Sequence, residues 1–350
     1  MPPTEVAARS RGAPDRAPRT FNQPVRVNGQ VRTIVISDLH LGQTGGISVL
    51  RLPGPLQRLL EMLRQYDRLV LLGDVLELAE SHSAYSVPIA EPVLRAIGEA
   101  LPAGAQVVLV PGNHDHGLIA DWVRGQGDSL AREAVVPHDA SALLTQMVGW
   151  LGADRVSVNY PGVWLSDEIW ATHGHYLNHY LRPISSYGLL HPRHRQRPAD
   201  VSRPSEYEHT ASGEAKPHMR DGLPPQRWFD RTFPTALAPL TAHVLSRQVR
   251  HHSLPALAHT VHALGVGAPW VIFGHVHRLG PMPGDRAAAW TGLSDGQRLL
   301  NTGCWRFEPV IGHRVHAPHP YWPGGAVVIG DDGIPNAVGL LDDLAEADFR

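Results

Sequence analysis

The sequence lacks the residues that make disulfide bonds and membrane spans. Its 350 residues include one cysteine, Cys304, so an intrachain disulfide is excluded, which fits a reducing compartment. The uninterrupted apolar runs are short: Leu69–Leu72 and Val107–Val110 have the length of a β-strand, whereas a membrane-spanning helix needs about 20 apolar residues. We therefore expect no transmembrane segment and a cytoplasmic location.

The sequence also lacks an excess of positive charge, and Lys216 is its only lysine. With 31 basic and 33 acidic residues the formal net charge is -2, which argues against a protein that binds nucleic acid with its whole surface, although nucleic acid stays open as a ligand. Histidine is abundant, with 22 residues. Four explanations account for this abundance of histidine: metal ligands, proton-transfer groups, a histidine-rich tract and compositional bias. Only the positions of the histidines in the sequence can distinguish between them.

Short apolar runs that end in polar clusters predict β-strands, and two stretches between them have helical spacing. The expected helices are Pro55–Gln65 and Ala90–Ala100. The expected strands are Thr33–Ile36, Leu69–Leu72, Val107–Val110, Glu168–Ala171, Trp270–Phe273, Leu299–Leu300 and Ala326–Ile329. The alternation of strand and helix in the first part of the chain is typical of an α/β fold.

Composition divides the chain into three parts. Residues 1–24 are rich in proline, arginine and alanine, contain no apolar centre of a secretory signal, and are predicted to be a disordered leader. Residues 178–265 interrupt the strand pattern and hold eleven Lys/Arg against six Asp/Glu. We interpret them as an inserted cap, partly helical and partly flexible, and assign the core to residues 25–177 and 266–345.

The chemistry of the sequence lies in polar residues that follow the predicted strands. Because ligands of α/β sheets bind at the carboxyl ends of strands, we expect these side chains to converge. Two carboxylates, one amide and four imidazoles suit Mn²⁺, Fe, Zn²⁺ or Ni²⁺ rather than Ca²⁺, and they exceed the needs of one tetrahedral ion. Two ions about 3.5–4 Å apart would account for all of them if one carboxylate bridges. The donors are Asp38, His40, Asp74, Asn113, His173, His275 and His277.

Five motifs in order give the sequence a resemblance to the calcineurin-like metallophosphoesterases. They are DLH at Asp38–His40, GD at Gly73–Asp74, GNHD at Gly112–Asp115, HG at His173–Gly174 and GHVH at Gly274–His277. The resemblance implies a β-sandwich of two mixed sheets flanked by helices, with an inserted cap. In layout the chain is most similar to UDP-2,3-diacylglucosamine hydrolases, but His114 stands where that group usually has arginine, as in phosphomonoesterases and nucleases of the wider family.

The resemblance also implies roles for these residues. A hydroxide shared by two metal ions would attack phosphorus in line, His114 would assist the leaving group, and Glu77 would orient His114. Two neighbours of the motifs keep two interpretations each: His175 contacts substrate or supports the rim of the site, and Arg278 binds a phosphate or forms a salt bridge. The implied ligands are Asp38, His40 and His277 for one ion, Asn113, His173 and His275 for the other, and Asp74 as the bridge.

The predicted function is therefore hydrolysis of phosphoric esters or anhydrides by a metal-dependent phosphatase, phosphodiesterase or pyrophosphatase. The expected substrate is a phosphorylated small molecule or a lipid-linked one, with phosphomonoesters, phosphodiesters and sugar-nucleotide pyrophosphates all open. The alternative is a scaffold of the same fold that makes only protein contacts, which the full set of donors disfavours. Peripheral membrane association through the cap and the oligomeric state stay open.

Overall fold

The computed structural model describes residues 31–43, 46–181, 201–214 and 238–349, so the predicted leader at residues 1–24 lies outside the described residues. Three strands carry the first motifs: β1 (Thr33–Ile36), β3 (Arg68–Leu71) and β4 (Gln106–Leu109). The other strands of the first half are β2 (Ile47–Ser48), β5 (Ala134–Val135), β6 (Val156–Tyr160) and β7 (Gly162–Trp164). The helices between them are α1 (Pro53–Leu63), α2 (Ser83–Ala100), α3 (Ala120–Gln126) and α4 (Ala142–Leu151).

The second half supplies further strands and helices. The strands are β8 (Ile169–Thr172), β9 (Trp270–Phe273), β10 (Arg298–Asn301), β11 (Arg306–Phe307), β12 (Gly325–Ile329) and β13 (Pro335–Gly339). The helices are the 3₁₀ helix η6 (His175–Tyr180), α5 (Pro204–Glu214), α7 (Ala238–Gln248), the π-helical turn η8 (Val249–Ser253), α8 (Leu254–Ala263) and α9 (Pro309–Gly312). No helix within the described ranges is both long and apolar enough to cross a membrane.

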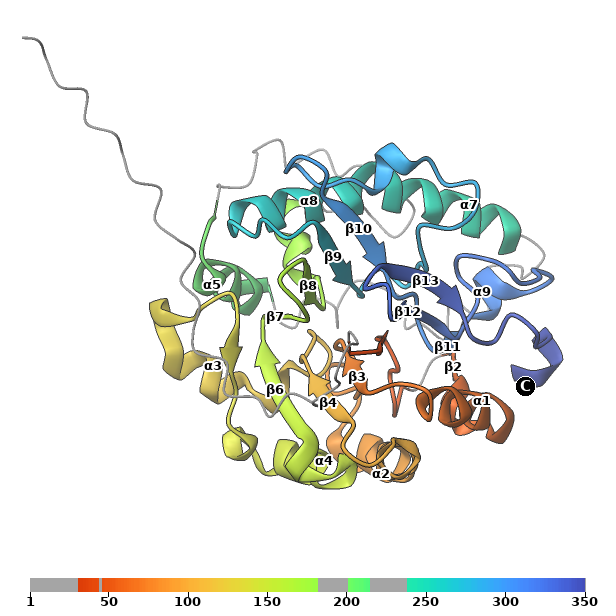
Figure 1. Ribbon diagram of the computed structural model, residues 1–350, viewed down its shortest axis with the longest axis horizontal. Helices are drawn as coiled ribbons and strands as arrows, with labels where there is room; N and C mark the ends of the chain where they lie inside the picture. Colours follow the sequence, from red (N-terminus) through yellow and green to blue (C-terminus); the bar gives the residue numbers. More distant parts are fainter. Residues whose placement is uncertain (1–30, 44–45, 182–200, 215–237, 350) are drawn as a thin grey trace, which may run out of the picture.

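The strands form two mixed sheets and a small ribbon, as expected. The first sheet has the order β13-β12-β1-β3-β4-β6-β5, with β1, β3, β4 and β6 parallel to one another. The second has the order β10-β9-β8-β7, with β8, β9 and β10 parallel. The ribbon pairs β11 with β2. Figure 1 shows the two sheets face to face between α2 and α4 below and α7 and α8 above.

The apolar pattern of the strands explains why the sheets stack. Successive strand residues point to opposite faces, and strands buried on both faces appear as continuous apolar runs. Val35, Val70 and Val108 of the first sheet share one apolar layer with Ala171 and Ile272 of the second. Their neighbours on the same strands face outward, where α1, α2 and α4 cover the first sheet and α8 covers the second. The predicted sandwich of two mixed sheets flanked by helices is confirmed.

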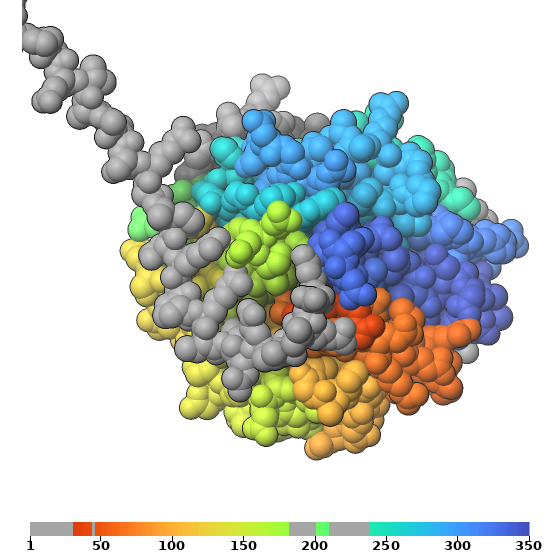
Figure 2. Space-filling view, viewed as in Figure 1, coloured from red at the N-terminus to blue at the C-terminus, as the bar shows by residue number. Residues whose placement is uncertain are grey.

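The described parts of residues 178–265 lie against this sandwich. Helix α8 packs on the second sheet through Leu257 and Val261, and Tyr207 of α5 belongs to the same apolar cluster. In Figure 2 the cyan and blue residues of the later part of the chain lie above the orange and yellow-green residues of the region that contains α2 and α4. The assignment of the whole segment as a cap stays a prediction.

Candidate metal centre

Both sheets present the ends of parallel strands at one edge, and the loops that follow are bonded to one another. The amide of Asp38 donates to the carbonyl of Gly73 at 3.0 Å, and that of His40 donates to the carbonyl of Asp74 at 2.9 Å. The amide of His275 donates to Asp38 Oδ2 at 3.0 Å, which joins the second sheet to the first. The structure thereby brings together all seven side chains predicted as donors, over residues 38–277.

The backbone of these loops is held in an uncommon conformation. Among the described residues, six non-glycine residues have positive φ angles, and five of them are predicted metal ligands. Such conformations cost about 1–3 kcal/mol each and persist where the surrounding structure fixes them for function. A side chain at Gly112 would overlap Asp74, so the loop needs glycine there. The five are Asp38, His40, Asp74, His275 and His277.

The donor atoms fall into three clusters in which they lie within 4.8 Å of one another. Asp74 belongs to two of them, and so does His40. The clusters are Asp38, His40 and His277; His40, Asp74 and His114; and Asp74, His173 and His275. The carboxylate of Asp74 therefore lies between two groups of imidazoles, as a bridging ligand would.

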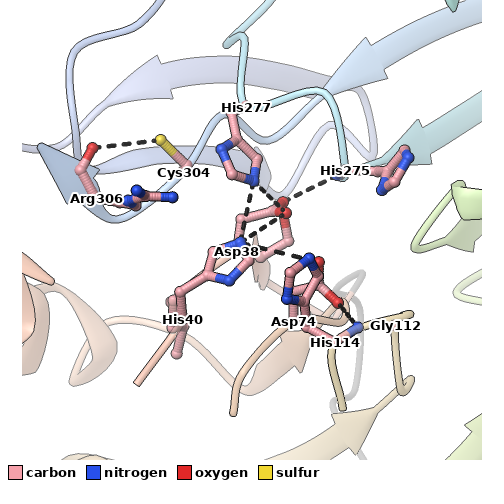
Figure 3. Close-up of polar contacts among 12 residues, drawn as sticks. Asp38, His40, Asp74, Gly112, His114, His275, His277, Cys304 and Arg306 are labelled. Carbon is pink, nitrogen blue, oxygen red and sulfur yellow. Dashed lines mark hydrogen bonds and ion pairs between the residues drawn. The ribbon is translucent and has the colours of Figure 1, made fainter. Parts of the chain in front are cut away.

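The atoms of the first group point at a common space. Nε2 of His277 lies 3.1 Å from Asp38 Oδ1 and 3.1 Å from Nε2 of His40. Figure 3 shows the rings of His277 and His40 both turned toward Asp38. Asp38 Oδ1 is buried and accepts no hydrogen bond from the described residues. A buried carboxylate oxygen of this kind beside two imidazole nitrogens fits a divalent cation.

The second group is built in the same way. Nε2 of His173 lies 3.2 Å from Asp74 Oδ2 and 3.2 Å from Asn113 Oδ1. Nδ1 of His173 bonds the carbonyl of Leu72 at 2.9 Å, which leaves Nε2 to act as a ligand. The ring of His275 lies 5.3 Å from that of His173, with its Nε2 bonded to Asn178. Asn178, which lies in η6, belongs to none of the five motifs of the sequence.

Glu77 connects the first group to His114. Its side chain is fully buried, and its carboxylate bonds Nδ1 of His114 at 2.8 Å and Nδ1 of His40 at 3.1 Å. Burial alone would raise the pKa of Glu77, but the hydrogen bonds from both histidines lower it to about 2. Burial lowers the pKa of His114, and its bond to Glu77 together with the charge of Asp74 outweighs this and raises it. The pair therefore favours a protonated His114 next to the clusters.

Metal binding at this site is expected to release protons. Burial lowers the pKa of His40 and His173, but neighbouring carboxylates, Asp38 and Glu77 at His40 and Asp74 at His173, raise it to about 10 and about 9. At about pH 8 both rings are thus protonated without metal, whereas a ligand must be neutral. Calorimetric titration of the metal-free protein with Mn²⁺ in Hepes and in Tris should give heats that differ with the ionisation enthalpy of the buffer, and affinity should rise with pH. Equal heats in both buffers would contradict this prediction.

A buried polar network that the sequence did not reveal adjoins the second group. Glu208 of α5 accepts hydrogen bonds from the hydroxyls of Tyr160 and Tyr176, and its other oxygen bonds His116 at 3.1 Å. Tyr160 also bonds Nε2 of His175 at 3.1 Å. Burial raises the pKa of Glu208, but the bond from His116 and the other contacts lower it to about 2. The network joins α5 to the core beside the metal-ligand candidates.

Replacing Glu208 with alanine is expected to lower the free energy of unfolding by roughly 2–4 kcal/mol, because the Tyr160 and Tyr176 hydroxyls would lose their buried acceptor. Urea unfolding followed by circular dichroism measures the change. Glu99→Ala, at an exposed position of α2, is the matched control and should change the unfolding free energy by less than about 0.5 kcal/mol. Equal stability of the two variants would show that the network contributes nothing.

The two predicted substrate contacts have other partners in the structure. The ring of His175 is buried 5.6 Å from that of His173, and burial together with the charge of His173 lowers its pKa to about 3. The guanidinium of Arg278 makes two hydrogen bonds to Asp285, at 2.9 and 2.7 Å, and packs on Trp290. The structure thus shows a buried salt bridge for Arg278 and a hydrogen bond to Tyr160 for His175, and the role of each toward substrate stays a prediction.

The chain is similar to one known family and to several solved structures. The family model of the calcineurin-like phosphoesterases matches residues 31–279. Among solved structures, the chain is similar to the Pseudomonas putida nuclease MPE, with 21% identity and a TM-score of 0.24, over 40% of this chain and 53% of the nuclease. A cold-active protein-tyrosine phosphatase of a psychrophilic Shewanella species is 14% identical with a TM-score of 0.32, over 88% of this chain and 80% of the phosphatase.

The search of curated proteins found no match to the chain. The part of the chain that is similar to the nuclease spans about half of the nuclease's length. The family model, by contrast, covers most of the chain and includes every residue of the three clusters. The chain therefore belongs to the calcineurin-like phosphoesterase family.

Proposed function

We propose that the protein is a hydrolase of phosphoric esters or anhydrides that depends on two divalent metal ions. The observation that carries this proposal is the shared position of Asp74, whose carboxylate belongs to a cluster on either side. We assign the ligands as Asp38, His40 and His277 for one ion, Asn113, His173 and His275 for the other, and Asp74 as the bridge. Mn²⁺, Fe, Zn²⁺ and Ni²⁺ suit this mixed oxygen and nitrogen set.

Divalent ions bound there would supply Lewis acidity to a phosphoryl group and to water. The protein's own residues prepare the site for them. Glu77 accepts a hydrogen bond from Nδ1 of His40, so that Nε2 of His40 faces Asp38. The carbonyl of Leu72 accepts a hydrogen bond from Nδ1 of His173 and leaves Nε2 of His173 to act as a ligand. Their ring orientations are thereby fixed before any ion binds.

His114 is proposed to protonate the leaving oxygen. Its Nδ1–H donates to Glu77, and the side chain is 21% exposed, so that Nε2 can meet a substrate. Because Glu77 favours the protonated ring, His114 carries the proton that a departing alkoxide or phosphate needs. Glu77 is the positioning residue for this step.

The test is a metal-dependence assay with the purified full chain. After metal removal, Mn²⁺, Zn²⁺, Ni²⁺ or Fe²⁺ is added back, and nitrophenol release is followed from mono- and bis-(nitrophenyl) phosphate. We expect hydrolysis of at least one substrate only with added metal, and about two ions per chain by elemental analysis. Absence of both turnover and bound metal would refute the hydrolase and favour a scaffold.

A further inference from the structure

A cavity of about 310 Å³ lies beside the candidate metal centre and has no role in the proposal above. Its wall includes His275 and His277, and Figure 3 shows Cys304 and Arg306 next to His277 on the same side. The volume is at the lower end of the range for small-molecule sites. A phosphate held among the predicted ligands would therefore stand at the edge of this cavity.

The wall of the cavity is mainly apolar. Leu177 and Leu181 line it from η6 and its end, Leu245 from α7, Val249 from η8 and Ile311 from α9. Leu181, Leu245 and Ile311 are only half buried, so apolar surface remains available to a ligand. Burial of that surface favours an apolar group over a polar one.

Arg306 and Glu308 of the wall form an ion pair with each other, although Nε of Arg306 has no hydrogen-bond partner among the described residues. Nη1 of Arg306 lies 3.1 Å from Oε1 of Glu308, and the Arg306 side chain is 6% exposed. A second charged group of a ligand would have to compete with this pair. The cavity is therefore suited to an uncharged organic group attached to the phosphate.

His114 is not among the residues that line the cavity. The ring of His40 contacts both, with its centroid 5.0 Å from that of His277 and 4.8 Å from that of His114. The group that would protonate the leaving oxygen thus lies outside the wall of the cavity. An organic group in the cavity is then the one that stays on phosphorus.

Building on the proposed function, we propose that the substrate is a phosphodiester whose retained group is an alkyl or aryl group bound in this cavity. Hydrolysis forms a bond from the water oxygen to phosphorus and breaks the bond from phosphorus to the leaving oxygen. The leaving oxygen takes a proton from His114, one proton of the water restores His114, and the other is released as the monoester ionises. The products are the monoester of the apolar group and a free alcohol.

The test compares alkyl nitrophenyl phosphates that share one leaving group and differ in the retained chain, methyl or octyl. We expect kcat/KM for the octyl ester to exceed that for the methyl ester by roughly tenfold or more. Leu245→Glu on α7 and Ile311→Glu on α9 should each bring this ratio close to one. Val244→Glu, at a 46% exposed neighbour on α7 outside the wall, should leave the ratio unchanged.

Binding of non-hydrolysable octylphosphonate and methylphosphonate, measured by calorimetry with the full chain, separates the two proposals. Tighter binding of octylphosphonate that is lost in Leu245→Glu supports the apolar site. Hydrolysis of both diesters at equal kcat/KM, or a ratio that neither wall variant changes, would overturn the inference and leave the hydrolase intact. If no diester or monoester is hydrolysed with any metal, the proposal that the protein is a hydrolase is refuted. The assignment of the cavity to the retained group is then refuted as well, even if octylphosphonate binds.

Discussion

Asp74→Asn is expected to abolish metal-dependent phosphoester hydrolysis, with kcat/KM reduced by about 10³-fold or more. The substitution removes the one carboxylate that belongs to clusters on both sides of the site, and the amide carries no charge with which to hold two cations. Asp74 also accepts the amide of His114 at 2.8 Å, a bond that asparagine can keep. Nitrophenol release and elemental analysis of the same preparation measure turnover and metal content together.

Asp121→Asn is the matched control for Asp74→Asn. The Asp121 side chain is 84% exposed on α3, where it pairs only with Arg124 among the described residues. It should keep wild-type turnover and metal content. If Asp74→Asn retains both as well, Asp74 is not the bridge and the two-ion assignment is wrong.

His114→Ala is expected to lower kcat by about 10²–10⁴-fold while the metal content stays near that of the wild type. The reason is that His114 is assigned to the leaving oxygen, whereas the other clustered histidines are assigned to the ions. The loss should be smaller for nitrophenyl esters than for alkyl esters, because nitrophenolate departs without a proton. Steady-state kinetics with both classes of ester measure this difference.

The same variant also tests the division of roles, since His114 lies in one cluster with His40 and Asp74. Loss of metal from His114→Ala would make it a ligand and leave the proton donor unassigned. Glu77→Gln should resemble His114→Ala in its ester dependence, because it weakens the hold on Nδ1 of His114 without removing the ring.

The sequence was sufficient to predict that the donor side chains converge, because each of them follows a buried strand. A residue such as Asp38 or His275 is placed by the apolar run before it, and parallel strands bring their ends to one edge. The contact of Glu77 with His114 was expected from the resemblance to the family, not from the residues themselves. The order of the five motifs along the chain assigned these residues to one site. This assignment needs no knowledge of the distances between them.

The contacts of residues 178–265 could not be predicted from strand ends or motifs. Glu208 lies two residues after Glu206 in a stretch without apolar periodicity, and its bond to Tyr160 spans 48 positions that no motif connects. Pro239 and Pro255 suggest interruptions of a helical stretch, yet α7, η8 and α8 follow one another without a break from Ala238 to Ala263. The π-helical turn η8 lies directly before Leu254 and Pro255, where proline cannot donate an intrahelical hydrogen bond.

The predicted donors come from both sheets: Asp38, Asp74 and Asn113 from the first, His173 and His275 from the second. Their separation therefore depends on the thickness of the apolar layer between the sheets. Protein interiors are close-packed and transmit small changes in volume. In the proposed centre, the side-chain sizes in that layer would thus limit which ionic radii fit between the two sheets, and substitutions of valine or alanine that touch no proposed ligand would shift metal preference.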